Sequence, residues 1–268
     1  MKTIFITGSS SGIGLATAKL FAQKGWRVIA TMRNPERAGE LAGMENVVVM
    51  PMNLTDPAQI RDTCAKALEK YDVDVLFNNA GYGIMAAFER LPEEAIRKVF
   101  DTDVIGTMLV TQQFIPHFKA RKAGTILTTT SLAGIIALPR DGAYGAAKRA
   151  QQGMLESLYY ELKPFGVNVK AIIPGGTKTN FQTPVNDKTG YEEVAKRQSA
   201  YLKNGHERFP GPEEAADTVW EAVHDGKDQI NYPADSICRE LYDQYIEMGM
   251  ERFKAYFCEL LYGERGNS

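Results

Sequence analysis

The chain has 268 residues, 44% of them hydrophobic, and its 31 Lys and Arg against 33 Asp and Glu give a formal charge of −2. A chain so close to neutral lacks the positive field that attracts nucleic acids and anionic membranes, so we expect a small-molecule partner instead. Three widely separated cysteines match no metal-ligand spacing and, being odd in number, argue against a disulfide framework. We therefore expect no metal and a reducing, cytoplasmic location. No stretch approaches the roughly 18 apolar residues of a membrane-spanning helix or resembles a signal peptide.

Short apolar, β-branched segments alternate with longer segments of helical periodicity, which predicts a parallel sheet covered by helices on both faces. The predicted strands are residues 3–7, 27–31, 46–50, 73–79, 124–130, 168–173 and 229–232. The predicted helices are residues 12–25, 34–42, 56–71, 92–121, 141–165 and 212–226. Repeated β-α-β units with right-handed crossovers indicate a doubly wound, Rossmann-like α/β fold, which we expect to be a single domain over residues 1–268.

Two segments depart from this alternation. Residues 175–210 are polar and rich in turn formers before a short amphipathic stretch, and a long insertion after a strand is typical of a substrate lid. Residues 233–268 are rich in aromatic side chains and are predicted to form a helical C-terminal extension of one or two helices. Three placements are open for this extension: it packs against the rest of the domain, packs against another subunit, or lines the substrate pocket.

A glycine-rich loop, TGSSSGIG, follows the first predicted strand and opens the first predicted helix. Its spacing is G-x-x-x-G-x-G, and glycine permits a tight turn and a close approach of the backbone to a phosphate. The free amides and the positive end of the helix dipole favour an anion. We expect this loop to hold a dinucleotide pyrophosphate, through Gly8, Ser10, Ser11, Gly12, Ile13 and Gly14.

Three further positions follow strands at the same carboxyl edge of the sheet. Arg33 ends the second strand with a planar fork suited to a 2'-phosphate, which favours NADP(H) over NAD(H); the alternative is an ordinary surface arginine. Asn53, with Leu54, follows the third strand and either hydrogen-bonds an adenine edge or caps a turn. The motif NNAG after the fourth strand brings Asn79, Ala80 and Gly81 to the cofactor crevice.

The segment AYGAAK places Tyr144 and Lys148 one helical turn apart on the same helix face. A free phenol, with a pKa near ~10, is a poor acid or base at neutral pH, but an adjacent ammonium favours its ionised form. Ser131, thirteen residues earlier, ends a predicted strand, and its hydroxyl is suited to donate to a substrate carbonyl oxygen. Together these residues predict proton transfer beside a bound nicotinamide.

These motifs resemble the short-chain dehydrogenases/reductases: TGSSSGIG, NNAG, Ser131 followed by AYGAAK, and PGGTKT at residues 174–179. The resemblance implies that Tyr144 is the general acid/base, that Ser131 orients the carbonyl, and that Lys148 binds the cofactor ribose and lowers the pKa of Tyr144. It also implies a homodimer or homotetramer built on the long helices. It adds cofactor contacts after the sixth predicted strand: Pro174 and Gly175, followed by Thr177 or Thr179 near the nicotinamide carboxamide.

One position departs from the family pattern. Where the family commonly has a catalytic asparagine on the long fourth helix, FDTDVIGT has Asp103. If the backbone of this residue holds a water, aspartate serves equally well; a buried carboxylate near Lys148 shifts the titration of Tyr144 instead. We expect retained activity with an altered pH profile, and we count Asp103 among the catalytic residues.

The segments that flank the expected reacting carbon are largely apolar, which suits a lipophilic ketone, aldehyde or alcohol. We therefore expect an NADP(H)-dependent oxidoreductase that transfers hydride between nicotinamide and such a carbon. Two alternatives remain: a catalytically silent NADP(H)-binding regulator, and an epimerase or dehydratase that uses NAD transiently on the same scaffold.

Overall fold

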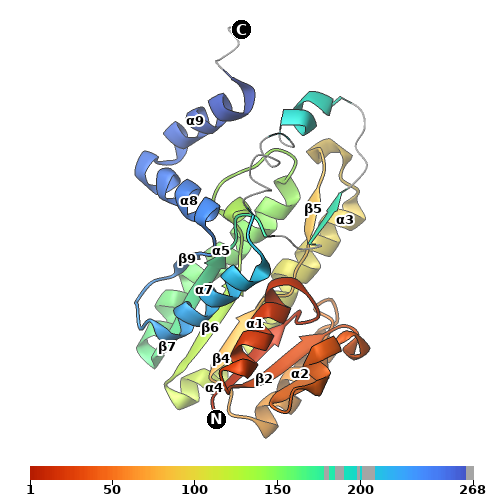
Figure 1. Ribbon diagram of the computed structural model, residues 1–268, viewed down its shortest axis with the longest axis vertical. Helices are drawn as coiled ribbons and strands as arrows, with labels where there is room; N and C mark the ends of the chain where they lie inside the picture. The colour runs from red at the N-terminus through yellow and green to blue at the C-terminus, as the bar shows by residue number, and fades with distance from the viewer. Residues whose placement is uncertain (178–180, 185–189, 198–199, 201–208, 264–268) are drawn as a thin grey trace.

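In the computed structural model, which describes residues 1–177, 181–184, 190–197, 200 and 209–263, a seven-stranded parallel sheet forms the centre of the molecule (Figure 1). Its strand order is β3-β2-β1-β4-β6-β7-β9. The strands are β1 Thr3–Thr7, β2 Arg27–Met32, β3 Val47–Pro51, β4 Val75–Asn78, β6 Gly124–Thr129, β7 Val167–Ile173 and β9 Asn231–Pro233. All seven predicted strands are therefore confirmed. The strand order reverses between β1 and β4, and ligands of such sheets bind in the crevice at that point.

Helices cover both faces of the sheet, as predicted. One face carries α1 Gly12–Gln23 and α7 Pro212–His224; the other carries α2 Pro57–Lys70, α4 Thr107–Arg121 and α5 Gly142–Leu162. The strands supply both cores because successive side chains point to opposite faces: Phe5 packs with α2 and α4, whereas Ile4 packs with α1 and α7. The fold class is the doubly wound α/β single domain that the sequence predicts.

The predicted helix over 34–42 is wrong. The chain forms two short 3₁₀ turns there, Pro35–Arg37 and Gly39–Gly43. Gly39 has a φ of +53°, and this left-handed conformation ends any α-helix that starts at Pro35.

The predicted helix over 92–121 is divided into three parts. These are α3 Glu93–Val99, a π-helical segment Phe100–Gly106, and α4. A Cβ atom at Gly106 would lie 2.6 Å from the carbonyl oxygen of Leu54, so glycine permits the close approach of the loop after β3. The widened π turn also contains Asp103, whose side chain is completely buried.

The sequence patterns missed a second, two-stranded sheet, in which β5 Gly83–Met85 pairs in parallel with β8 Gln182–Pro184. Three-residue strands are too short for a periodic signal. This pairing joins the segment after β4 to the segment after β7, both at the carboxyl edge of the main sheet. The backbones of these two segments are fixed to each other in this way.

The C-terminal extension forms two helices, α8 Ser236–Met248 and α9 Met250–Tyr262, beside one end of the sheet in Figure 1. Leu241, Phe253 and Phe257 belong to the same core as the sheet face under α4 and α5.

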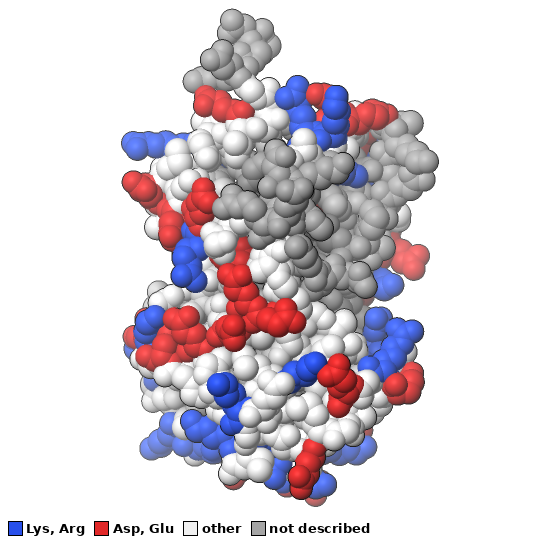
Figure 2. All heavy atoms as spheres, viewed as in Figure 1, with Lys and Arg blue, Asp and Glu red and all other residues white. Residues whose placement is uncertain are grey.

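Acidic and basic side chains lie on the same face of the molecule in Figure 2, in agreement with the small net charge. Among the described helices, the longest apolar stretch is too short or too polar to cross a bilayer.

Candidate active site

The glycine loop between β1 and α1 forms a cradle that side chains would fill. Gly8 and Gly12 have φ values of +70° and +56°, a conformation that glycine adopts without strain. A Cβ atom at Gly14 would lie 2.3 Å from the Gly8 carbonyl oxygen. Helix geometry leaves the amides of Gly12, Ile13 and Gly14 without acceptors within α1, so they point to where an anion binds. The loop therefore fits a dinucleotide pyrophosphate.

Asn79 connects this cradle to β4 and β6. Its Nδ2 donates to the carbonyl oxygens of Thr7 and Gly8, each at 3.1 Å, and its Oδ1 accepts from the Thr129 hydroxyl at 3.2 Å. The Thr7 hydroxyl oxygen accepts in turn from the amides of Asn79 and Ala80, at 2.9 and 3.0 Å. The two predicted cofactor segments, TGSSSGIG and NNAG, thus form one hydrogen-bonded unit. The polar atoms of the Asn79 side chain are largely committed to this unit.

The adenosine end of the crevice contains the other predicted positions. Arg33 follows β2 directly and its side chain is exposed. Asn53 is half-buried, and its Oδ1 accepts from the Thr55 amide at 3.2 Å and the Thr55 hydroxyl at 3.0 Å. Its carbonyl group therefore builds a turn, and only its Nδ2 is left to donate outward. Leu54 is buried against Gly106.

The structure brings together Ser131, Tyr144 and Lys148 at the carboxyl ends of β6 and β4. Ser131 follows β6, and its Oγ accepts from the Ala133 amide at 3.1 Å. The Ser131 hydroxyl lies close enough to the Tyr144 phenol to lower the pKa of that phenol. The Lys148 Nζ lies 5.7 Å from the centroid of the Tyr144 ring. The helical spacing that predicted one shared face on α5 is therefore confirmed.

Lys148 is only 1% exposed, and three acceptors surround its ammonium. The Nζ donates to the Thr129 carbonyl oxygen and to Gln151 Oε1, each at 3.1 Å, and lies 3.2 Å from Asp103 Oδ2. An ammonium has three hydrogens to donate, and two of them are used by Thr129 and Gln151. The contact with Asp103 is an ion pair without a hydrogen bond, so one hydrogen remains for a cofactor ribose.

Asp103 reaches the site from the π-helical segment. Its side chain is 0% exposed, and its Oδ1 accepts from the Tyr82 amide at 3.2 Å. A Cβ atom at Gly81 would lie 2.7 Å from Asp103 Oδ2, so the NNAG glycine makes room for this carboxylate. The carboxylate predicted to lie near Lys148 does so, as a buried ion pair.

Four cofactor-binding residues are predicted after β7, and the structure describes three of them. The Pro174 carbonyl oxygen accepts from the Leu132 amide at 2.9 Å, which ties this turn to the segment after Ser131. The Gly175 amide donates to Asp235 Oδ2 at 2.7 Å, so α8 already occupies this donor. Thr177 is half-buried. Thr179 lies outside the described residues.

The family model of the short chain dehydrogenases matches residues 2–190. The chain belongs to this family. It is 32% identical over 249 residues to the uncharacterized oxidoreductase YusZ of Bacillus subtilis (strain 168), covering 87% of this chain and 88% of the relative. It is 34% identical over 251 residues to 17-beta-hydroxysteroid dehydrogenase type 1 of Homo sapiens, covering 85% and 76%. A solved short-chain dehydrogenase from Streptomyces avermitilis superposes with a TM-score of 0.86 at 27% identity, covering 96% and 95%.

A short-chain dehydrogenase is an oxidoreductase that uses NAD(P) to act on hydroxyl or carbonyl groups, so the predicted family and enzyme class are confirmed. The glycine cradle and the crevice at the strand-order reversal are the parts of this chain that fit such a dinucleotide. Among the described residues, no cluster of His, Cys, Asp and Glu forms a metal-binding set.

The protonation of this short-chain dehydrogenase site follows from burial. Burial raises the pKa of the Tyr144 hydroxyl above its usual 10.0; the Ser131 hydrogen bond lowers that pKa, and the Asp103 and Asp141 carboxylates raise it further. Burial also raises the pKa of Asp103, against the opposing effects of Lys148 and the Tyr82 amide. Tyr144 therefore holds its proton at neutral pH, and its pKa is raised rather than lowered, contrary to the expectation from the sequence.

Sequence reasoning missed three residues of the short-chain dehydrogenase site. The Phe181 ring contacts the Tyr144 ring, with centroids 5.7 Å apart, and the Phe181 carbonyl oxygen accepts from the Gly83 amide at 3.1 Å. Gln151 binds Lys148, and Tyr82 binds Asp103. Only Gln151 had a sequence signal, because it is a polar residue three positions after Lys148 on the same helix face. The other two depend on long-range loop packing.

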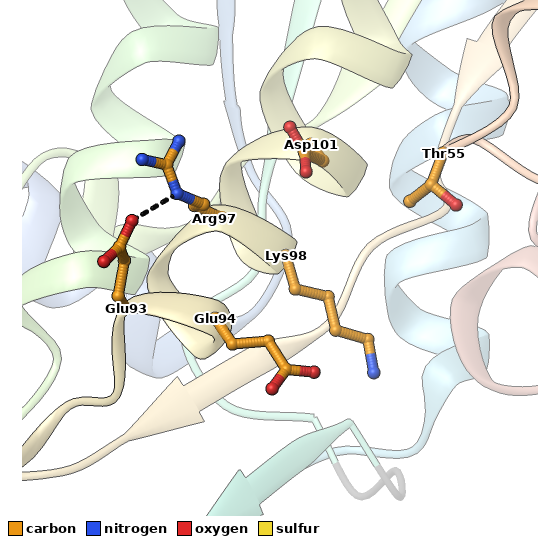
Figure 3. A pocket seen from close by; sticks show the side chains of 6 residues that line it. All are labelled: Thr55, Glu93, Glu94, Arg97, Lys98 and Asp101. Carbon is orange, nitrogen blue, oxygen red and sulfur yellow. Dashed lines mark hydrogen bonds and ion pairs between the residues drawn. The ribbon is translucent and has the colours of Figure 1, made fainter.

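A separate surface pocket of about 660 Å³ lies beside α3 (Figure 3). Its lining is charged and exposed, and Glu93 and Arg97 within it form an ion pair at 2.7 Å. The lining residues are Thr55, Glu93, Glu94, Arg97, Lys98 and Asp101, and none of them is a predicted site residue of this short-chain dehydrogenase.

Proposed function

We propose that this short-chain dehydrogenase is an NADP(H)-dependent oxidoreductase that transfers hydride between nicotinamide and an apolar ketone, aldehyde or alcohol, with Tyr144 as general acid/base. The observation that carries the proposal is the grouping of Ser131, Tyr144 and Lys148 beside the glycine cradle. Ordinary packing explains each residue separately, but it does not explain a buried phenol, hydroxyl and ammonium at the cofactor edge of a parallel sheet.

In the direction of reduction, the Tyr144 hydroxyl donates its proton to the substrate oxygen while the substrate carbon gains hydride. Bound NADPH supplies that hydride. The Ser131 hydroxyl donates a hydrogen bond to the same oxygen and stabilises the negative charge that develops on it. Lys148 holds the cofactor ribose and keeps a positive charge near the phenol. In the direction of oxidation, the Tyr144 phenolate accepts the alcohol proton.

The proposed cofactor site follows the carboxyl edge of the sheet. The glycine loop holds the pyrophosphate, Arg33 the 2'-phosphate, and Asn53 with Leu54 the adenine. The exposed guanidinium of Arg33 directly after β2 supports NADP(H) over NAD(H), because its fork matches a phosphate. The remaining contacts are Asn79, Ala80, Gly81, Pro174, Gly175, Thr177 and Thr179.

The apolar side chains packed around Tyr144 support a lipophilic substrate. Ile84, Val99 and Ala143 pack in one cluster with Tyr144, and Phe181 and Tyr82 lie against that cluster. Walls of this kind desolvate an apolar ligand and hold few polar groups. The name of the human relative, a hydroxysteroid dehydrogenase, points to the same substrate class. We assign the role of a substrate lid to residues 175–210, through the contact of Phe181 with Tyr144.

We also propose a homodimer or homotetramer. Ile105 and Tyr160, on the π-helical segment and on α5, are 48% and 74% exposed, although large apolar side chains are usually buried. Light scattering of the purified protein measures the mass directly, and a monomer at micromolar concentration contradicts the proposal.

The first experiment titrates the purified protein with NADPH and with NADH and follows nicotinamide fluorescence. A clear preference for NADPH supports Arg33 as the phosphate ligand; a preference for NADH assigns Arg33 to the surface. Turnover is then measured with a panel of lipophilic ketones and aldehydes, for the native chain and for Tyr144→Phe. Loss of turnover with unchanged cofactor binding supports catalysis by Tyr144. Equal turnover of both proteins contradicts it, and binding without turnover in the native chain supports the silent regulator.

A further inference from the structure

Gln151 lies on the same face of α5 as Tyr144 and Lys148 and is only 2% exposed. Both ends of its amide are used. Its Oε1 accepts from Lys148 Nζ at 3.1 Å, and its Nε2 donates to the Asp103 carbonyl oxygen at 2.5 Å and to the Thr107 hydroxyl at 3.2 Å. A buried amide with every group paired is held in one orientation.

These contacts close a ring of three residues. Gln151 binds the main chain of Asp103 with its nitrogen and the ammonium of Lys148 with its oxygen, and that ammonium pairs with the Asp103 carboxylate at 3.2 Å. The ring joins α5 to the π-helical segment. It fixes the position of the Lys148 ammonium beside Tyr144, which lies one helical turn away on α5.

The three acceptors of Lys148 differ in how firmly they are held. The Thr129 carbonyl belongs to the sheet, and Gln151 is anchored by Asp103 and Thr107. Asp103 Oδ2, by contrast, accepts no hydrogen bond in the described part of the chain beyond its ion pair with Lys148. The charge of Lys148 therefore stays paired with Asp103, one ammonium hydrogen is left for a further acceptor, and Gln151 is the anchored acceptor that keeps the lysine in place.

We propose that Gln151 is a positioning residue: its side-chain amide holds Lys148 beside Tyr144 while the third ammonium hydrogen of Lys148 donates to the cofactor ribose. This inference rests on the proposed function, because it assigns Lys148 a role toward the cofactor. It adds a residue that touches neither cofactor nor substrate and acts only through Lys148.

Removal of the amide leaves the ammonium free to move away from the phenol. The charged groups around Tyr144 are Asp141 and Lys148, together with Asp103 from the π-helical segment, which itself lies against Tyr82. When the Lys148 ammonium moves away, it no longer offsets the negative charges of Asp103 and Asp141, and the pKa of Tyr144 rises. Alcohol oxidation, which requires the phenolate, then needs a higher pH.

The test compares Gln151→Met with Gln152→Met. Gln152 is the adjacent residue, is 4% exposed, and donates to Glu156 and Asn231 instead of to the ring. The two variants thus lose the same chemical group from equally buried positions. NADPH affinity is measured by fluorescence titration, and the pH dependence of alcohol oxidation is measured with NADP⁺.

We expect Gln151→Met to weaken NADPH binding about tenfold or more. We also expect the acidic limb of its pH–rate profile, where the oxidation rate rises as Tyr144 ionises, to move to higher pH. Gln152→Met leaves both unchanged. A purely structural defect lowers the active fraction equally at every pH and does not move the limb. If Gln151→Met does not fold, Gln151→Asn replaces it: the amide is kept, but its shorter side chain does not reach Lys148, and the same loss of NADPH affinity and upward shift of the limb are expected.

An unchanged NADPH affinity and pH limb in the Gln151 variant overturns this inference alone. A native chain that binds neither NADPH nor NADH overturns the proposed function, and the inference with it. A native chain that binds NADPH without turnover contradicts the catalytic role, and the binding comparison of Gln151→Met with Gln152→Met then decides the positioning role.

Discussion

Asp141 carries an unusual carboxyl group at the first turn of α5. It occupies the N-cap position but makes no capping hydrogen bond, and it is 5% exposed. Its Oδ1 has no hydrogen-bond partner in the described part of the chain. Burial raises the pKa of this carboxyl from 3.8 to about 7, against a lowering by Arg140. We predict that Asp141→Asn stabilises the protein, and more so as the pH rises.

The size of the expected stability difference follows from the linkage between proton binding and folding. Because the pKa of Asp141 is higher in the folded state, the folded protein binds this proton more tightly than the unfolded chain does. Its favourable contribution is complete below pH 3.8 and is lost as the pH rises to about 7. A pKa difference of this size corresponds to about 4 kcal/mol. Asparagine does not titrate, so its advantage over aspartate grows by about 3 kcal/mol between about pH 5 and about pH 8.

The assay is urea unfolding of both proteins across this pH range, and the quantity is the difference between their free energies of unfolding. Contributions from all other titrating groups cancel in that difference. Asp62→Asn, whose side chain is 58% exposed on α2, serves as the control and is expected to show a small, nearly constant difference. A difference for Asp141→Asn that does not change with pH refutes the reasoning. The same variant should lower the pH at which Tyr144 ionises, because it removes one of the carboxylates that oppose ionisation.

Three further changes test the site and its support. Asp103→Asn should retain activity but move the acidic limb of the oxidation profile to lower pH, since a carboxylate near Tyr144 is lost; superimposable pH-rate curves contradict this electrostatic role. Arg33→Ala should weaken NADPH binding at least about tenfold and leave NADH binding unchanged, and an equal loss for both cofactors argues against a phosphate contact. Lys170→Met should cost about 2 kcal/mol in urea unfolding, because Asp225 loses its nearer counter-ion at 3.0 Å and keeps only Lys227 at 3.6 Å; a cost below about 1 kcal/mol contradicts this.

Much of the fold was predictable because the signals are local. The main strands are short runs rich in β-branched residues; TIFIT is buried throughout, whereas VVVM, at the edge of the sheet, is half-buried. The glycine loop is equally local, since its spacing, the preceding strand and the following helix lie within about 25 residues. The shared face of Tyr144 and Lys148 follows from helical periodicity alone.

Short or interrupted elements were not predictable in this way. The 3₁₀ turns at 35–43 depend on the φ of Gly39, and the π-helical segment depends on the contact of Gly106 with Leu54. The β5–β8 pair joins segments about a hundred residues apart, and no three-residue window encodes its partner.

For this protein, the sequence alone determined the sheet, the glycine cradle and the shared helix face of Tyr144 and Lys148, because each depends on neighbours in the chain. Only the tertiary structure decided what surrounds those groups: that Lys148 is held by Thr129, Gln151 and Asp103, and that Phe181 covers Tyr144. Charge state and orientation depend on burial and on partners from distant segments, and these exist only once the sheet has brought the carboxyl ends of its strands together.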